Sequence, residues 1–293
     1  MSVVKSSLKK ILKLFGFDPT GFNQGLAGAS IKWAVKQQGL LDLVEKLRKI
    51  APDISNQESS EKSSFNDYCE KKRRALQAFQ CSMMLKIIGI CGKNKVMVVD
   101  IGDSAGTHML YLKELTKNKY EVDTIGVNLD PRAIEKIKAR GMKALLCRAE
   151  DLDLGEKEID FFTSFQMIEH LHNPSIFFRR LANKSKGNRM LVTLPYLKRS
   201  RVGFYKIKNQ DGKKYYAEEE HIFELSPEDW RLLMLHSGWR VVYEKVYYQY
   251  PKKIPIISWI LSRFWRSMDF EGFWAAIIEK DTKLSDLYMD WEE

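Results

Sequence analysis

The chain has 293 residues, of which 44% are apolar and 12% aromatic, and it carries a formal net charge of +10 at pH 7. This length fits one α/β domain of ordinary size plus an accessory part, and the apolar fraction argues against an intrinsically disordered protein. The positive charge favours an anionic partner, such as nucleic acid, a membrane surface or a phosphorylated substrate, although a solvated basic surface would give the same total.

The cysteines and the hydropathy pattern bear on the compartment. Cys69, Cys81, Cys91 and Cys147 lie far apart without a C-x-x-C pair, which indicates neither a disulfide framework nor a zinc site. No apolar run approaches the roughly 18 residues that a transmembrane helix needs, and the N-terminus lacks the apolar segment of a signal peptide. We therefore expect a cytoplasmic protein, either soluble or attached to a membrane surface.

Residues 1–64 form a predicted N-terminal helical extension with a linker. Apolar residues from Leu8 to Phe15 recur at i, i+3, i+4 and i+7, which predicts an amphipathic helix ending at Gly16. Such a helix can lie on an anionic membrane or act as a transit peptide, but most often it docks on the core. A second helix is expected over Ile31–Ile50, and the polar segment Pro52–Ser64 is the expected linker.

From Phe65 onward, helices and strands alternate. This alternation predicts a parallel sheet covered by helices on both faces, with a ligand at the carboxyl ends of the strands. The expected strands are Val96–Ile101, Asp123–Val127, Lys143–Cys147, Ile159–Phe165 and Arg189–Leu194. The expected helices are Phe65–Ile90, Thr107–Leu115, Pro131–Arg140 and Pro174–Leu181.

After Pro195 the alternation is interrupted by two insertions. The first, 196–221, is rich in Lys and Arg and ends in acidic residues; the second, 249–271, contains the apolar and aromatic run Ile254–Trp265. This run could enter a membrane interface, cover the site as a lid, or join the core. Ser226 is placed to cap a helix, strands are expected at Arg240–Tyr248 and Gly272–Ile278, and residues 282–293 form an acidic tail.

Four stretches carry a resemblance to a known family. They are VVDIGDSAG, TIGVNLDPRAIEKIKARG, CRAEDLDL with IDFFTSFQMIEHLHNP, and HIFELSPEDWRLLMLHSGWRVV. Over residues 65–281 the chain resembles class I S-adenosylmethionine-dependent methyltransferases, specifically the branch of small-molecule, ubiquinone-type O-methyltransferases. The resemblance implies a doubly wound, seven-stranded Rossmann-like sheet, the cofactor S-adenosyl-L-methionine and a methyltransferase domain over these residues.

The resemblance also implies a cofactor site. The cofactor-binding residues that it indicates are Asp100, Gly102, Ser104, Gly106, Asn128, Leu129, Ala149, Glu150, Phe165 and Gln166. Three positions depart from the family pattern. Ser104 replaces the middle glycine, which is tolerated if its φ is negative. Asn128 replaces the acidic residue that binds the ribose hydroxyls, at an expected cost of about 1 kcal/mol. Arg148 replaces an adenine-binding Asp, for which Glu150 is the expected substitute.

Methyl transfer to a hydroxyl needs a general base with a pKa near neutrality, and histidine fits this requirement. His170, just past the fourth strand, is the first candidate, although a structural role is about equally expected. His221, at the end of the first insertion, is the second, although a solvated loop histidine is the commoner reading. His108 is expected to line the cofactor pocket, and His172 and His236 to be surface or packing residues. No metal site is expected, because Glu169, His170 and His172 crowd into one turn.

The sequence therefore predicts an O-methyltransferase acting on a small-molecule, glycan or lipid-linked acceptor that is anionic, with peripheral contact to an anionic membrane. A nucleic-acid methyltransferase is the alternative that the charge and the basic run Lys71–Arg74 support, but Ser164–Met167 offers no base-binding pocket. A methyltransferase fold that has lost its cofactor and serves as a scaffold stays open. A dehydrogenase is disfavoured, because the motif Gly102-x-Ser104-x-Gly106 lacks the G-x-G-x-x-G spacing.

Overall fold

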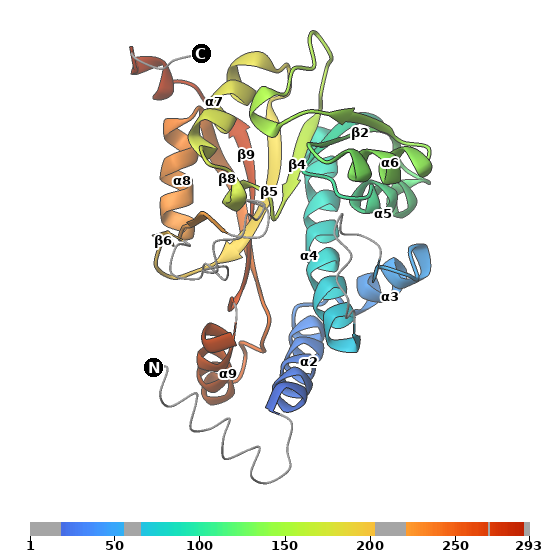
Figure 1. Cartoon of the computed structure of the whole chain (residues 1–293), viewed down its shortest axis with the longest axis vertical. Coiled ribbons are helices and arrows are strands. Elements are labelled where there is room, and N and C mark those ends of the chain that lie inside the picture. Colours follow the sequence, from blue (N-terminus) through green and yellow to red (C-terminus); the bar gives the residue numbers. More distant parts are fainter. Residues whose placement is uncertain (1–18, 56–65, 203–220, 269, 290–293) are drawn as a thin grey trace, which may run out of the picture.

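The computed structural model describes residues 19–55, 66–202, 221–268 and 270–289 (Figure 1). The predicted amphipathic helix at Leu8–Phe15 and much of the first insertion lie outside these residues. The helices are α2 (Pro19–Gln37), α3 (Leu41–Ile50), α4 (Asp67–Cys91), α5 (Thr107–Thr116), α6 (Pro131–Ala139), α7 (Pro174–Lys184), α8 (Pro227–His236) and α9 (Pro255–Met268). The short 3-10 helices are η2 (Ala149–Asp151), η3 (Ile168–His170) and η6 (Ser285–Leu287).

The central sheet has seven strands in the order β3-β2-β1-β4-β5-β9-β8, which confirms the predicted fold class. Its strands are β1 (Lys95–Ile101), β2 (Glu121–Asn128), β3 (Lys143–Leu146), β4 (Phe161–Phe165), β5 (Arg189–Tyr196), β8 (Trp239–Tyr248) and β9 (Gly272–Lys280). The first five in the spatial order are parallel, whereas β9 runs antiparallel to both β5 and β8. A separate two-stranded ribbon pairs β6 (Arg201–Val202) with β7 (Phe223–Glu224).

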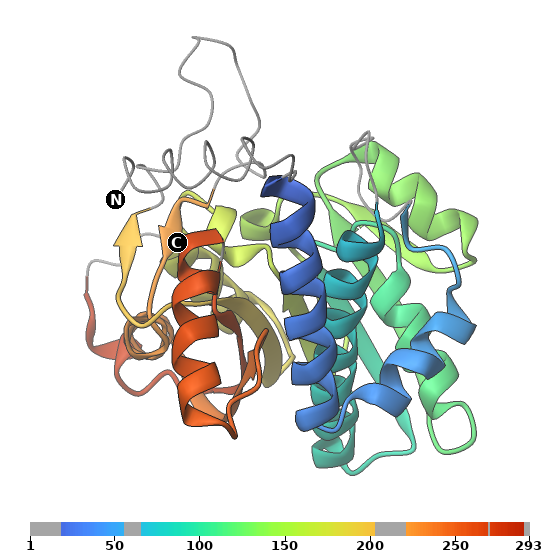
Figure 2. The same cartoon turned by 90° about the horizontal axis from the view of Figure 1, so that it is seen from below.

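Helices cover the sheet on both faces (Figure 2). The strands therefore carry apolar residues on both sides. On one face, Phe79 and Met84 of α4 pack with Met109 of α5 and with strand residues. On the other face, Phe178 of α7 and Trp230 of α8 share a cluster with further strand residues. Burying each such side chain contributes about 1.5–3 kcal/mol, so the two apolar layers fix the frame of the site.

Capping residues set the ends of α4 and the start of α8. Asn66 accepts a hydrogen bond from the Cys69 N–H at the start of α4, and Gly92 ends this helix with a φ of +66°. Ser226 caps α8 through the Asp229 N–H, as predicted. The single helix predicted over Ile31–Ile50 is wrong, since Gly39 with a φ of +71° separates α2 from α3.

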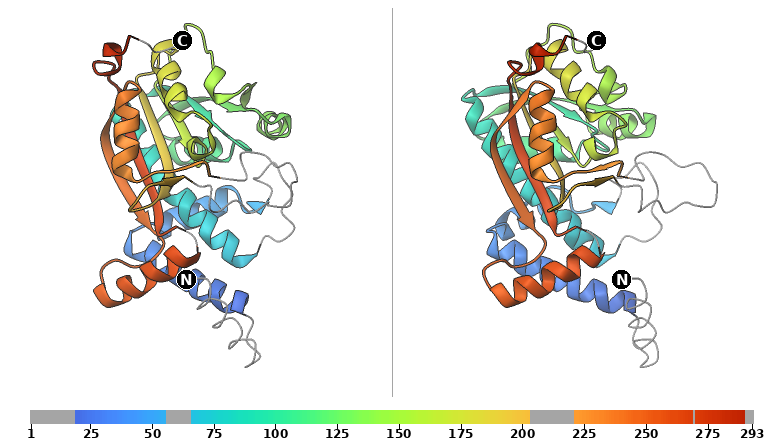
Figure 3. Two further views of the ribbon diagram at one scale, coloured as in Figure 1. Left: turned by 60° about the vertical axis from the view of Figure 1, so that its left-hand side comes forward. Right: turned by 90° about the vertical axis from the view of Figure 1, so that its left-hand side faces the viewer.

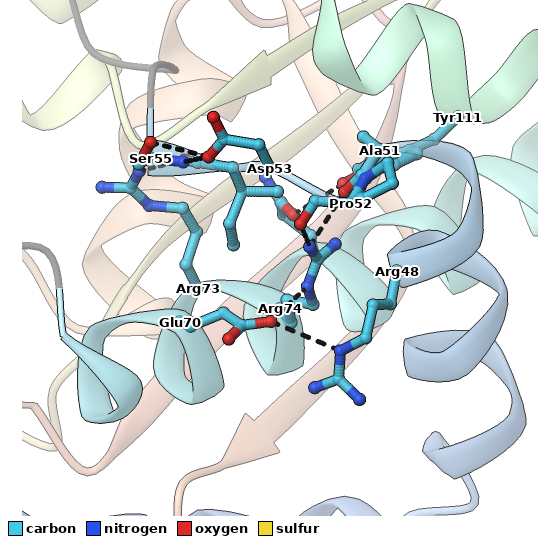
Figure 4. Close-up of polar contacts among 11 residues, drawn as sticks. Arg48, Ala51, Pro52, Asp53, Ser55, Glu70, Arg73, Arg74 and Tyr111 are labelled. Atoms are coloured by element: carbon cyan, nitrogen blue, oxygen red, sulfur yellow. Dashed lines mark hydrogen bonds and ion pairs between the residues drawn. The ribbon is translucent and has the colours of Figure 1, made fainter.

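The two arginines of the basic run Lys71–Arg74 on α4 bind other parts of the protein (Figure 4). Arg74 is fully buried, where its guanidinium donates to the carbonyls of Ala51 and Pro52 at 2.8 and 2.6 Å and to the Glu70 carboxylate at 3.0 Å. Arg73 donates to the Ile54 carbonyl at 2.8 Å. These arginines therefore attach the segment that follows α3 to α4. Because Arg74 is buried, it neither lies on a solvated face nor contacts a phosphate of a bound partner.

The second insertion contains the helix α9, whose residues were identified from the sequence only as an apolar and aromatic run. Its Trp265 is fully buried, so part of the run does join the core. None of the helices within the described ranges combines the length and the hydropathy that crossing a membrane requires. In the predicted acidic tail, η6 is held by Arg179, whose guanidinium donates to the Ser285 hydroxyl at 2.7 Å and pairs with Asp286 at 3.2 Å.

Candidate active site

The loop after β1 lies at the switch point of the sheet, because the chain leaves β1 toward β2 on one side and leaves β4 toward β5 on the other. Gly102 and Gly106 both adopt left-handed backbone conformations, with φ of +89° and +72°. Gly106 then caps α5, whose first N–H groups point out of the helix. Among the described non-glycine residues Gln166 alone has a positive φ, so Ser104 meets the condition that the sequence set for it.

Met167 limits the space above the glycine loop. A Cβ added at Gly102 would lie 2.7 Å from the Met167 Cγ, so this glycine lets η3 approach β1 closely. At Gly102 the neighbour is a flexible methionine side chain, which a ligand entering the loop could displace.

Two buried carboxylates support the loop. Asp100 accepts a hydrogen bond from the Thr163 hydroxyl at 2.7 Å, and Asp103 accepts from the N–H groups of Ala105 and Gly106 at 3.1 and 2.6 Å. Burial raises the pKa of both groups, in the case of Asp103 to about 6. The sequence analysis missed Asp103, although an Asp two residues before a loop N–H is a typical turn-forming signal.

Asn128 joins this loop to the end of β2. Its side-chain amide donates to the Asp103 carbonyl at 3.0 Å, and its oxygen accepts from the Asp130 N–H at 2.8 Å. Asp130 in turn caps α6 by accepting a hydrogen bond from the Arg132 N–H. Leu129, between them, is 62% exposed and open to a ligand. The ribose role of Asn128 stays a prediction, and holding the loop is its structural role here.

The predicted adenine residues lie next to Asn128. The Cys147 N–H donates to the Asn128 carbonyl at 3.1 Å, which brings the chain after β3 to the end of β2. Ala149 and Glu150 follow in η2, and both are half-buried. The Glu150 carboxylate lies 3.7 Å from the Arg148 guanidinium. These hydrogen bonds therefore bring the ends of β1, β2 and β3 together, and the adenine roles of Ala149 and Glu150 stay a prediction.

The end of β4 is strained. Gln166 adopts a φ of +55°, which is uncommon for a residue with a side chain, and its N–H donates to the Thr193 carbonyl at 3.0 Å. Phe165, before it, contacts the ring of His108 with 4.6 Å between centroids. The His108 Nε2 lies 2.9 Å from the Gln80 oxygen. His108 is thus beside the predicted cofactor positions, as expected.

Burial lowers the pKa of His108 from 6.5 to about 4, so its imidazole is neutral at pH 7. Because the folded pKa lies below the unfolded value, the contribution of His108 to stability is complete above about pH 6.5 and is lost as the pH falls toward 4, by roughly 3 kcal/mol. We expect His108→Gln to remove this pH dependence. Urea unfolding of both proteins at pH 7 and pH 4.5 measures it. The matched control is His172→Gln at an exposed histidine, and equal pH dependence in all three proteins would contradict the expectation.

The two candidate bases come together in the structure. The rings of His170 and His221 meet edge to face, with 4.7 Å between centroids, and Phe270 stacks on His221 at 5.3 Å. The Ile222 N–H donates to the Glu169 carbonyl at 2.9 Å, which holds the end of the first insertion against η3. His172 and His236 are exposed, which agrees with the surface role expected for them.

The partner of His221 is a carboxylate that the sequence did not single out. Glu224 is 2% exposed, and its Oε1 lies 3.4 Å from the His221 Nδ1. It also pairs with Arg201 across the ribbon of β6 and β7. A buried carboxylate on Nδ1 orients the ring and leaves Nε2 for other chemistry.

Glu169 is a second buried carboxylate at this place. It is fully buried, neither of its oxygens has a hydrogen-bond partner among the described residues, and burial raises its pKa to about 7. Glu169, His170 and His221 each offer one ligand atom within 4.8 Å of the others, a set that could hold a divalent cation. The absence of a metal site stays a prediction. The sequence argument against a metal site rested on the spacing of Glu169, His170 and His172 and did not include His221.

The strand order and the glycine loop with its supporting carboxylates define the class I methyltransferase fold. The chain belongs to the methyltransferase-domain family, whose sequence model matches residues 62–244. This membership confirms the predicted class of enzyme, whose methyl donor is S-adenosylmethionine, and leaves the ubiquinone-type branch untested. No curated protein matches the chain.

Solved structures agree on the fold. The magnesium protoporphyrin IX methyltransferase of Synechocystis PCC 6803, solved with bound S-adenosylmethionine, is 11% identical over 81% of this chain and 90% of its own, with a TM-score of 0.50. The 1,6-didemethyltoxoflavin-N1-methyltransferase of Burkholderia thailandensis is 12% identical over 84% and 89%, with a TM-score of 0.50. The cyclase SpnF is 11% identical over 82% and 94%, with a TM-score of 0.51. At such identities the likeness concerns the fold alone.

Proposed function

We propose that the chain transfers a methyl group from S-adenosylmethionine to an oxygen of a small-molecule, glycan or lipid-linked acceptor, with the histidine pair as the source of the general base. The observation that carries the proposal is the contact of His170 with His221, at the carboxyl end of β4 and backed by Glu224. A base at this end of the sheet faces the place where a ligand of the β1 loop would lie.

Within the pair, His221 is the stronger candidate for the base. The Glu224 carboxylate is placed to accept a hydrogen bond from the His221 Nδ1–H, and this tautomer leaves the Nε2 lone pair free to take a proton from an acceptor hydroxyl. His170 then borders the ring edge-on and restricts its orientation. Bound S-adenosylmethionine would supply an already activated methyl group, so the contribution of the protein is alignment and proton removal.

The cofactor would be held by the loop from Gly102 to Gly106, with Asn128 and Leu129 beside the ribose and Ala149 and Glu150 beside the adenine. Two features of the structure support this fit: the left-handed glycines bracket the loop, and Asp100 is buried beneath it.

An anionic acceptor is proposed because of the net charge of +10 and because Lys198 and Arg199, which follow β5, are exposed. The nucleic-acid alternative is weaker than the sequence alone suggested, since Arg73 and Arg74 bind backbone carbonyls of this chain. A cyclase with the same fold shows that the architecture does not by itself fix the reaction, so cofactor binding has to be measured.

Isothermal titration of the full-length chain with S-adenosylmethionine and with S-adenosylhomocysteine tests this function. We expect a single site, which Gly106→Val weakens at least about tenfold because a β-branched residue resists a positive φ. The control is Gly155→Val, at another left-handed glycine that lies outside the loop. Screening hydroxylated acceptors for release of S-adenosylhomocysteine then identifies the substrate. No binding of either ligand would contradict the proposal.

A further inference from the structure

The helix α9 has two faces that differ sharply in burial. The inner face packs against the protein through Ser258, Leu261, Ser262 and Trp265. The outer face carries Ile256, Trp259 and Ile260, which are 75%, 58% and 52% exposed. These side chains lie three and four residues apart and therefore form one stripe. Single exposed apolar residues are ordinary, but a stripe of large ones on one helix marks an interaction surface.

The outer face of α9 lies on a surface that α2 helps to build, because the two helices occupy the same end of the molecule (Figures 1 and 3). The Trp265 indole N–H donates to the Ser30 hydroxyl at 3.1 Å, and the Lys252 N–H donates to the Gln37 side chain at 2.8 Å. Trp33, one turn after Ser30 on α2, is 40% exposed. These hydrogen bonds hold α9, and with it the exposed apolar stripe, against α2.

The charged side chains of the two segments that build this surface are all basic. Neither the segment 19–37 nor the segment 249–268 contains an Asp or a Glu. Lys32, Lys36, Lys253 and Arg263 are exposed on them, and the Arg263 guanidinium lies 3.6 Å over the ring of Trp259. An apolar stripe bordered by lysines, arginines and a tryptophan is the composition of helices that lie in a lipid interface.

We propose that the outer face of α9, with the cations of α2 beside it, docks this protein on the surface of an anionic lipid bilayer. Anionic lipids match the uniform positive charge. A second copy of the chain does not, since joining two such faces would bring cations together without an acidic partner from either segment. The helix lies in the plane of the interface and does not cross it.

The position of α9 ties docking to the candidate active site. The helix lies between the end of β8 and the start of β9, where Tyr248 pairs with Gly272, and the same connection carries Phe270, which stacks on His221. The docking face and the histidine pair are therefore at the same end of the sheet. A membrane-bound enzyme would meet an acceptor held at the lipid surface without the acceptor having to leave it.

Vesicle co-sedimentation of the full-length chain tests the proposal. The probes are vesicles of phosphatidylcholine alone and of phosphatidylcholine with phosphatidylglycerol. We expect binding to the anionic vesicles, and Ile256→Ser/Trp259→Ser should lower the partition coefficient at least about tenfold. Lys253→Gln/Arg263→Gln should weaken binding and make it less sensitive to salt. The matched control is Leu232→Ser/Leu287→Ser, at apolar residues that are 51% and 74% exposed on other elements.

Circular dichroism confirms that each variant is folded before the vesicles are added. Equal binding by the wild type and by Ile256→Ser/Trp259→Ser would overturn the proposal, as would failure of the wild type to bind either vesicle. Size-exclusion chromatography adds a third outcome. A dimer of the wild type that Ile256→Ser/Trp259→Ser dissociates would assign the face to a second copy and overturn membrane docking.

Discussion

His221→Gln is expected to lower kcat with the acceptor found by screening at least about 100-fold, while the Kd for S-adenosylmethionine stays within about twofold. Glutamine has no group that can accept a proton at neutral pH, so the base is lost while the volume is largely kept. Most of the predicted cofactor residues lie at the ends of β1, β2 and β3, and only Phe165 and Gln166 lie at the end of β4, so cofactor affinity should change little. Steady-state kinetics and titration calorimetry separate the two effects.

Three further variants test whether the loss of turnover is specific to His221. Glu224→Gln should lower kcat by less than His221→Gln, because the carboxylate only orients the ring. His170→Ala should also lower turnover more than cofactor affinity, because His170 restricts the orientation of the His221 ring, and turnover equal to that of the wild type would contradict this role. His236→Gln, at an exposed histidine on α8, should change nothing. Wild-type kcat in His221→Gln would contradict the assignment.

The same proteins distinguish a base from a cation ligand. If Glu169, His170 and His221 hold a divalent cation, a chelator should abolish turnover, and Mn²⁺ or Mg²⁺ should restore it in the wild type and not in His221→Gln. If His221 acts as a base, turnover should be indifferent to the chelator.

Gly272→Ala is expected to lower the free energy of unfolding by about 3 kcal/mol or more. A Cβ at this position would lie 1.9 Å from the Tyr247 carbonyl oxygen. Since that atom belongs to the backbone of the paired strand β8, relief requires β8 and β9 to separate. The melting temperature should fall by about 6 °C or more, as thermal unfolding followed by circular dichroism would show.

The matched control for this prediction is Gly89→Ala. Gly89 is exposed near the end of α4, and a Cβ there meets no atom within 4 Å. Alanine favours helix over glycine by about 1 kcal/mol, so this variant should be slightly more stable than the wild type. Similar melting temperatures for Gly272→Ala and the wild type would show that the strand contact is looser than described.

The class of fold and the position of the loop after β1 could be predicted from the sequence. Alternating apolar runs and capped helices are local signals, since each depends on residues a few positions apart, and they located β1, the loop from Gly102 to Gly106 and α5. The resemblance to class I methyltransferases, and not these local patterns, implied one cofactor site at the β1 loop, the end of β2 and the turn after β3, and the cofactor roles of these residues stay a prediction.

Only the tertiary structure decided which distant groups meet. His221 follows His170 by fifty-one positions in the numbering, and no local pattern could show that their rings touch or that Glu224 backs one of them. The burial of Arg74 and the two faces of α9 are likewise consequences of packing against α3 and α2. Local spacing fixes helices, strands and turns, whereas burial and pairing across the fold fix the charge states and partners of the side chains that do the chemistry.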